Sequence, residues 1–272
     1  VVERMDKEFP DNQYTVAANF WEVDYYRDLG DFKKAEALLS AMNTRFGRKK
    51  DVKKDILYES AFIAFKRGQE QQALAQVSEL LKLEPEGDIA ARAAYLQGDI
   101  FSEIGDYAAA VNSYQACLKN LPGYELENAC RGRLGDCNYS LYSKNHDDKY
   151  LDNAIAEYNV LSGRRNLSSS IRQQTLFKLG KCYEGKKDDE KAMEYYKELI
   201  FNYKTDSASG VYTRPVWLVK AAYAAIDIYM AQDTPEAAAA AVNVYNVLNG
   251  LNLNIGDDYR KIIEKIRRKF KL

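Results

Sequence analysis

Small and apolar residues recur along the chain with the spacing of one helix face. Six alanines are each followed, four and seven residues later, by an apolar or aromatic side chain. Residues at i, i+4 and i+7 share one face of an α-helix, so the pattern predicts six amphipathic helices. The sets are Ala35, Leu39 and Met42; Ala73, Val77 and Leu80; Ala110, Tyr114 and Cys117; Ala154, Tyr158 and Leu161; Ala192, Tyr196 and Leu199; and Ala238, Val242 and Tyr245.

The spacing of these alanines predicts a repeat array. Successive alanines are 38, 37, 44, 38 and 46 residues apart, which is a period near 37 with two longer intervals. Such a period fits a pair of helices and is typical of stacked repeats. A preceding helix in each pair is indicated by Ala61, Gly98, Gly135 and Gly180, since small residues let two helices approach closely. We therefore expect six helix–turn–helix repeats with insertions in the two long intervals.

Residues that start and stop helices fall between the predicted elements. Glycine closes a helix in the left-handed conformation, and aspartate or threonine caps the next helix by accepting backbone N–H groups. Proline suits the first helical position and stops a preceding helix. We assign closing to Gly30, Gly68 and Gly105, capping to Asp31, Asp106 and Thr234, the first helical position to Pro235, and stopping to Pro85 and Pro122.

These positions together resemble the tetratricopeptide repeat (TPR) family. The resemblance rests on Leu134-Gly135, Leu179-Gly180, the recurrent alanines, and one full repeat with Tyr95, Gly98, Phe101, Gly105, Tyr107, Ala110, Tyr114 and Pro122. It implies an all-α, right-handed solenoid over residues 1–272. Within it, residues 1–12 would end a preceding helix, 13–256 would form six repeats, and 257–272 would form a capping helix. The segment EFPDNQY and the period above 34 are similar to the bacterial envelope branch, which includes the Tol-Pal coordinating protein and outer-membrane assembly lipoproteins.

Two segments depart from the family pattern. The fourth repeat has no turn glycine and carries SKNHDDKYLDN, about seven extra residues, which we expect between its two helices. Residues 201–217 add about eight residues between the fifth and sixth repeats. The polar part of that insertion, 205–214, is either a functional loop or a tolerated insertion.

The last helix predicted from the sequence has an apolar face and a basic face. Tyr259, Ile262, Ile263, Ile266 and Phe270 fall on one side. A solenoid needs a polar outer surface at its end, so we expect a solvated cap. The alternative is that the basic residues bind an acidic partner or membrane surface; they are Arg260, Lys261, Lys265, Arg267, Arg268, Lys269 and Lys271.

Composition narrows the classes of partner. There are 39 basic and 40 acidic residues, so the net charge gives no general attraction to nucleic acid. No apolar run approaches the roughly 20 residues of a membrane span. The chain begins at Val1 with what resembles the end of a helix, and we expect it to belong to a longer protein. The envelope resemblance favours the bacterial periplasm or envelope over the cytoplasm, and the oligomeric state stays open.

No catalytic or metal-binding pattern is present. The four cysteines, Cys117, Cys130, Cys137 and Cys182, lack metal-ligand spacing, and we expect buried free thiols, although Cys117 and Cys137 could meet between repeats. His146 is the one histidine, and a solvated loop residue is a simpler interpretation than a base beside Asp147. Phosphate-binding loops, nucleophile elbows and HExxH are missing. We therefore predict no enzyme activity, no cofactor and no metal.

The resemblance implies that the first helices line a groove, and two positions there form a pattern. Aromatic residues occupy the first position in five of six repeats, and acids occupy the second in four of six. Aromatic side chains bind with little entropy loss, and acids favour a cationic ligand. Packing between helices and pairing with residues such as Arg27 are the alternatives. The predicted partner-binding residues are Phe20, Asp24, Tyr58, Phe62, Tyr95, Asp99, Asp136, Phe177, Lys181, Tyr223 and Asp227.

The predicted function is a non-catalytic scaffold that binds a protein or peptide segment in this groove. The lysines and asparagines that hold a C-terminal carboxylate in chaperone-binding relatives are replaced here by aromatic and acidic residues, which disfavours that mode. Two alternatives stay open: the aromatic positions bind a glycan or small molecule, or the chain is the regulatory arm of a larger enzyme.

Overall fold

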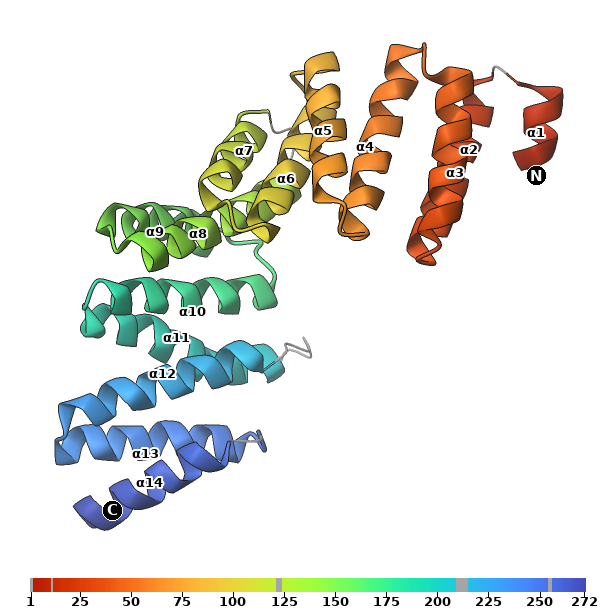
Figure 1. The fold of residues 1–272 in the computed structure, drawn as a ribbon. Helices are drawn as coiled ribbons and strands as arrows, with labels where there is room; N and C mark the ends of the chain where they lie inside the picture. The colour runs from red at the N-terminus through yellow and green to blue at the C-terminus, as the bar shows by residue number, and fades with distance from the viewer. Residues whose placement is uncertain (1, 11, 121–123, 209–214, 254–255) are drawn as a thin grey trace. The chain divides into compact units, whose positions relative to one another are not determined.

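The computed structural model describes residues 2–10, 12–120, 124–208, 215–253 and 256–272, and the regular structure in these ranges is α-helical throughout (Figure 1). The chain divides into two compact halves, Val1–Cys137 and Asn138–Leu272. Helix α8 contains the boundary between them. Each half is built from antiparallel helix pairs, as the sequence predicts for an α-solenoid.

The first half holds α1 to α7 and most of α8. Its helices are α1 (Val2–Glu8), α2 (Gln13–Asp28), α3 (Phe32–Phe46), α4 (Lys50–Lys66), α5 (Glu70–Leu83), α6 (Asp88–Glu103), α7 (Tyr107–Lys119) and α8 (Tyr124–Asn145). The pairs α2–α3, α4–α5 and α6–α7 pack closely, and α3 also packs on α4 and α5 on α6. This is the order expected when each repeat stacks on the next.

The second half continues with six more helices. They are α9 (Asp148–Ser162), α10 (Ser169–Gly185), α11 (Asp189–Ala208), α12 (Val216–Gln232), α13 (Pro235–Gly250) and α14 (Asp257–Phe270). The pairs α10–α11 and α12–α13 pack closely, and α14 packs on α13. Ile263 and Ile266 of α14 are buried in the core cluster of this half.

The predicted alanine faces form the core in five repeats, and the sixth needs a correction. In the first five repeats the alanine and both apolar residues that follow it are buried. In α13 the buried residues are instead Ala237, Ala241, Val244 and Leu248, while Val242 and Tyr245 are half-buried. The core face of this alanine-rich helix is therefore set one residue earlier than predicted, although Ala238 is itself buried.

The predicted turns are confirmed where they are described. Gly30, Gly68 and Gly105 have φ of 76°, 69° and 79°, which is the left-handed region that favours glycine. Asp106 accepts a hydrogen bond from the Ala109 N–H at 3.1 Å, and Asp31 and Thr234 cap α3 and α13 in the same way. Helix α5 ends at Leu83, two residues before Pro85, whereas Pro122 lies outside the described residues.

The two long intervals differ from the prediction because helices extend into them. In the fourth repeat, α8 runs to Asn145 and α9 begins at Asp148, so the connection is only His146 and Asp147 rather than a long loop. His146 takes the glycine role with φ of 54°. In the segment 201–217, α11 runs through Ala208 and α12 begins at Val216, while 209–214 lie outside the described residues.

Glycines in two first helices sit directly against a tyrosine of the second helix. A Cβ placed on Gly98 would lie 2.5 Å from Tyr114 Cε1, and one on Gly180 would lie 2.3 Å from Tyr196 Cε1. Both tyrosine rings are fully buried. The prediction that small residues allow close helix approach is therefore confirmed at these two positions, with the bulky partner coming from the second helix.

All four cysteines are buried thiols outside any disulfide, as expected for thiols in the core. Cys130 Sγ lies 3.1 Å from the Tyr114 carbonyl oxygen, and Cys137 Sγ lies 3.8 Å from Ser102 Oγ. Within the part of the chain that the structure describes, no helix is long and apolar enough to span a bilayer. The same residues contain no cluster of His, Cys, Asp or Glu suited to a metal ion.

Candidate functional site: hollows along the first helices

The predicted partner-binding residues all lie on the first helices of their repeats. The structure places Phe20 and Asp24 on α2, Tyr58 and Phe62 on α4, Tyr95 and Asp99 on α6, Asp136 on α8, Phe177 and Lys181 on α10, and Tyr223 and Asp227 on α12. Three of them line a hollow in the first half, and four line a separate hollow in the second half. The other four line neither hollow.

Asp24, Tyr58 and Phe62 line a hollow of about 610 Å³ in the first half, which we call the α2–α4 hollow. Tyr58 and Phe62 are one helical turn apart on α4, and both are half-buried. The hollow falls in the size range of small-ligand and side-chain pockets. The rest of its lining is Arg27, Asp28, Phe32, Glu59, Lys66 and Arg92.

Arg27 organises the charges of this hollow. Its Nη1 lies 2.6 Å from both Asp24 Oδ1 and Glu59 Oε2, and its guanidinium carbon lies 5.6 Å from the centroid of the Phe62 ring. Lys66 Nζ lies 5.3 Å from the same centroid. A cation at this distance from an aromatic ring is attracted to its face. Phe62 is therefore held by two cations while one side of it still borders the hollow.

Burial changes the ionisation of two residues in the α2–α4 hollow. It raises the pKa of the Glu59 carboxyl, against the opposing effect of Arg27, and it raises the pKa of the Tyr58 hydroxyl. The lining carries three acidic and three basic side chains. The expected preference for a cationic ligand thus finds no excess of negative charge here.

The second hollow, of about 480 Å³, lies between α10 and α12 and includes Phe177, Lys181, Tyr223 and Asp227. The Phe177 ring lies 5.5 Å from the Trp217 ring, measured between centroids. Lys220 Nζ lies 4.8 Å from the Trp217 centroid. We call this the α10–α12 hollow.

Three of the predicted residues in the α10–α12 hollow also have partners within the protein. The Tyr223 ring stacks on Tyr259 of α14 with centroids 3.8 Å apart. Tyr259 Oη donates to Asp227 Oδ2 at 2.9 Å, and Lys181 forms an ion pair with Glu184. Burial, together with the bond to Asp227, raises the pKa of Tyr259. Tyr223 and Asp227 therefore hold the capping helix, which is the packing alternative.

The remaining predicted residues line neither hollow. Tyr114 Oη donates to Asp99 Oδ1 at 2.6 Å, and Arg133 Nε lies 3.3 Å from the same carboxylate oxygen. The Tyr95 ring lies 5.6 Å from that of Tyr114, so both predicted residues of α6 brace the buried tyrosine. Phe20 packs against the buried core formed by α2, α3 and α4, and Asp136 is half-buried on α8.

Comparison with known proteins agrees with the helix-pair architecture. The sequence family described as tetratricopeptide repeat-like domain matches residues 1–138, and the tetratricopeptide repeat itself matches residues 174–205. The chain belongs to the tetratricopeptide repeat family. No curated protein sequence matches it significantly.

Solved TPR structures share the fold at low sequence identity. BtubC (BKLC) from P. vanneervenii is 20% identical with a TM-score of 0.60, covering 78% of this chain and 88% of that chain. MamA from Desulfovibrio magneticus RS-1 is 18% identical with a TM-score of 0.56, covering 70% and 96%. The TPR-like repeats of a putative kinesin light chain from Podospora anserina are 14% identical with a TM-score of 0.56, covering 75% and 100%. These likenesses establish the TPR fold of the chain.

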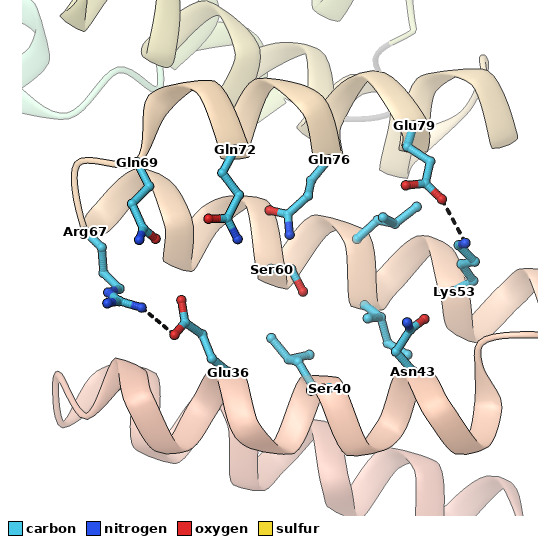
Figure 2. A pocket seen from close by; sticks show the side chains of 13 residues that line it. Glu36, Ser40, Asn43, Lys53, Ser60, Arg67, Gln69, Gln72, Gln76 and Glu79 are labelled. Carbon is cyan, nitrogen blue, oxygen red and sulfur yellow. Dashed lines mark hydrogen bonds and ion pairs between the residues drawn. The ribbon is translucent and has the colours of Figure 1, made fainter.

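Sequence reasoning missed part of this TPR surface. Glu59 and Lys66 of the α2–α4 hollow were not predicted, although their three- and four-residue spacing from Phe62 was a usable signal, whereas the pairing of Arg27 with an acid was one of the predicted alternatives and is seen with Asp24. A further hollow of about 530 Å³ lies between the second helices α3 and α5, over α4 (Figure 2). Its sequence signal is the set Gln69, Gln72 and Gln76, which places one amide at the N-cap of α5 and two along the helix.

Proposed function

We propose that this TPR chain is a non-catalytic scaffold that binds a segment of a partner protein on its first helices, with the α2–α4 hollow as the main contact. The observation that supports the proposal most strongly is a half-buried aromatic pair, Tyr58 and Phe62, beside Arg27 in a hollow of about 610 Å³. Tyrosine and arginine in partly covered hollows are the residues that most often dominate binding energy at protein interfaces.

The geometry suits one apolar side chain of a partner with polar neighbours. The rings of Tyr58 and Phe62 offer rigid apolar area, whereas Lys66 and Asp28 are exposed at the hollow. Because positive and negative lining residues balance, the hollow favours a helix or peptide segment of mixed charge. The α10–α12 hollow, whose Phe177 ring packs against Trp217, would be a second contact of the same kind.

A pull-down with matched aromatic variants tests this proposal. Three proteins are compared on an extract of the source organism: the native chain, Tyr58→Ser/Phe62→Ser, and Trp21→Ser/Tyr25→Ser. Trp21 and Tyr25 are exposed aromatics on α2 that line neither hollow, so they control for general stickiness. Circular dichroism confirms that all three are folded.

We expect the native chain and the Trp21/Tyr25 variant to retain the same protein, and the Tyr58/Phe62 variant to lose it. Photo-crosslinking from position 62 then gives the partner segment. Retention of the same protein by all three would refute the α2–α4 hollow as the binding site. Equal loss by both variants would indicate non-specific aromatic binding and would also refute it.

Two broader expectations belong to the same proposal. One is that residues 1–272 act as a single array of repeats. The other is that the protein works in a bacterial envelope, supported by the segment EFPDNQY and the repeat period above 34. Fractionation of the source cells, with the chain detected by antibody, checks the second expectation.

A further inference from the structure

Helix α2 carries a row of large apolar side chains that are mostly exposed. Tyr14 and Trp21 are each 65% exposed, Leu29 is 64% exposed and Tyr25 is 49% exposed. Their spacing of seven, four and four residues places them on one face of the helix. The rings of Trp21 and Tyr25 are stacked, with centroids 5.9 Å apart. We call these four residues the α2 stripe.

The same face is covered in the other first helices. The turn that follows each first helix has a residue with positive φ: Gly30, Gly68, Gly105, His146, Lys187 or Asp233. The positions that lie 16, 12, 9 and 5 residues before it are, in α2, Tyr14, Ala18, Trp21 and Tyr25. At these positions α4, α6, α8, α10 and α12 have buried or half-buried residues, with Ile171 of α10 as the exception. This face of a first helix is therefore normally an interior surface of the array.

The preceding repeat covers this face elsewhere in the first half. Leu96 and Ile100 of α6 are buried at these positions. They belong to one core cluster with Ala61 and Ala64 of the preceding first helix, α4. The corresponding cluster between α6 and α8 contains Ala91, Ala94, Cys130 and Leu134. Alanines three residues apart on a neighbouring helix thus pack on larger side chains, and a helix of that kind is the occupant that this face fits.

On α2 the second helix of such a cover is in place. Helix α1 packs on α2, as α3 packs on α4. Asn19 Nδ2 donates to Asp6 Oδ1 at 3.1 Å, and Thr15 Oγ1 donates to the Phe9 carbonyl oxygen at 2.7 Å. Asn19 and Trp21 are two residues apart, so they lie on nearly opposite sides of α2. Helix α1 therefore leaves the α2 stripe exposed, and no described helix lies where a preceding first helix would lie.

The charges beside the α2 stripe are negative. Glu22 follows one edge of the stripe, and Asp28, with a side chain 74% exposed, follows the other. The one basic residue of α2, Arg27, is shared among Asp24, Asp28 and Glu59. A helix with lysine or arginine beside its apolar face would complement these acids.

The α2 stripe is large enough for a specific contact. A covered aromatic side chain buries about 150–250 Å², so its three rings offer about 350 Å² at their exposure of 65%, 65% and 49%. With Leu29 and the matching area of a partner helix, the contact would bury about 1,000 Å². That area is at the lower end for specific protein interfaces and suits a reversible contact.

A second copy of this chain fits the α2 stripe poorly. Two stripes facing each other would oppose rings to rings in place of small residues, and would bring the acids Glu22 and Asp28 of both copies together. The basic helix α14 of another copy does not fit either, because its apolar residues Ile263 and Ile266 are buried in its own core. These observations favour a helix of a different protein.

We propose that the α2 stripe binds an amphipathic helix of a partner protein, with alanine-sized residues of that helix on Trp21 and Tyr25 and its basic residues beside Glu22 and Asp28. The bound helix lies beside α1, where a preceding first helix would pack. Neither ring lines the α2–α4 hollow, so this inference and the proposed function can fail separately. In the pull-down above, the Trp21/Tyr25 variant would lose this helix and keep the ligand of the hollow.

The indole NMR signals of Trp21 and Trp217, assigned with Trp217→Phe, test the inference in a peptide titration. The first probe is a capped helical peptide as long as α2, 16 residues, with alanine along one face and lysine on both sides of that face. A second probe has glutamate in place of each lysine, and a third has a central proline, which breaks the helix. We expect the first probe to shift Trp21 and not Trp217, and the other two to bind at least tenfold more weakly.

Two variants and one control experiment complete the test. Trp21→Ser/Tyr25→Ser should raise the Kd of the first probe about tenfold or more, measured by calorimetry, because the aromatic contacts are lost. Tyr58→Ser/Phe62→Ser is the matched control and should bind the probe as the native chain does. Equal binding of the glutamate or proline peptide, a shift of Trp217 alone, no shift, or equal loss in both variants would each overturn the inference. Sedimentation that shows self-association of the native chain but not of the Trp21/Tyr25 variant would make a second copy the occupant and would also overturn it.

Discussion

The contact between Gly98 and Tyr114 gives the sharpest test of how the repeats are packed. Replacing Gly98 by alanine adds one Cβ to α6, and that atom would lie 2.5, 2.7 and 2.8 Å from three atoms of the Tyr114 ring. Ordinary carbon contacts are about 3.5–4.0 Å. The ring or the helix must therefore move by about 1 Å. The Tyr114 ring is fully buried and its hydroxyl donates to Asp99. Moving the ring or the helix would therefore disturb core packing or weaken this hydrogen bond.

The expected magnitude follows from three effects. Overpacking a core costs about 1–3 kcal/mol, and weakening the bond to the Asp99 carboxylate adds up to about 1.5 kcal/mol. Alanine in place of glycine within a helix contributes about 1 kcal/mol in the opposite direction. We expect a net loss near 2 kcal/mol, which corresponds to about 30-fold in an equilibrium constant.

Native-state hydrogen exchange measures this change where it occurs. The slowest amides of α6 and α7 should exchange about 30-fold faster in Gly98→Ala than in the native protein. Gly250→Ala is the control, because a Cβ at that end of α13 meets nothing within 4 Å, and it should leave exchange unchanged or slightly slower. In a Tyr114→Ala background the added Cβ should cost almost nothing, as a double-mutant cycle would show. Exchange in Gly98→Ala that equals the native rate would refute the close approach of α6 and α7.

Three further predictions address capping, ionisation and thiol reactivity. Asp106→Ala removes the acceptor for the Ala109 N–H and should lower the free energy of unfolding by about 1 kcal/mol, measured by urea unfolding; Asp258→Ala, at an exposed first-turn position of α14, is the control. Burial raises the pKa of Glu59 above its unfolded value of about 4.3, so the folded state holds an extra proton between the two values and stability falls as pH rises through that window. Urea unfolding across this pH range should show that component in the native protein and not in Glu59→Gln; identical profiles would contradict it. The four buried cysteines should not react with a thiol reagent at neutral pH until the protein unfolds, because they are covered and burial raises the pKa of Cys137 to about 11; labelling followed by mass spectrometry would expose any fast site.

The turns show what local sequence can and cannot predict. Gly30, Gly68 and Gly105 were readable because glycine takes positive φ at no cost. Positive φ at His146, Lys187 and Asp233 could not be predicted, since these residues adopt it only when the flanking helices impose it. The long intervals were misjudged for a related reason: helix α8 continues through residues that look like a loop because of their charge.

The candidate sites also differ in how far local sequence predicts them. Tyr58 and Phe62 could be found because one helix and the repeat period are enough to align them. Glu36 and Gln72, which line the hollow between α3 and α5, belong to different repeats, and their distance depends on how those repeats stack, which no local pattern encodes. The stacking itself is set by small residues such as Gly98, whose partner Tyr114 was predicted only as part of the core.

Helix α4 borders two hollows with opposite faces. An α-helix turns about 100° per residue, so Tyr58 and Phe62 fall within about 40° of each other, while Lys53 and Ser60 lie roughly opposite them. The first pair lines the α2–α4 hollow and the second lines the hollow between α3 and α5, with Ala61 and Ala64 buried in the core. Because the two surfaces are about a helix diameter apart, roughly 10 Å, substitutions at one should add to those at the other with little coupling. A partner that bound both would therefore lose the sum of the two effects in Phe62→Ser/Gln76→Ala. A loss clearly larger than that sum would mean that the two surfaces act through a shared movement of α4.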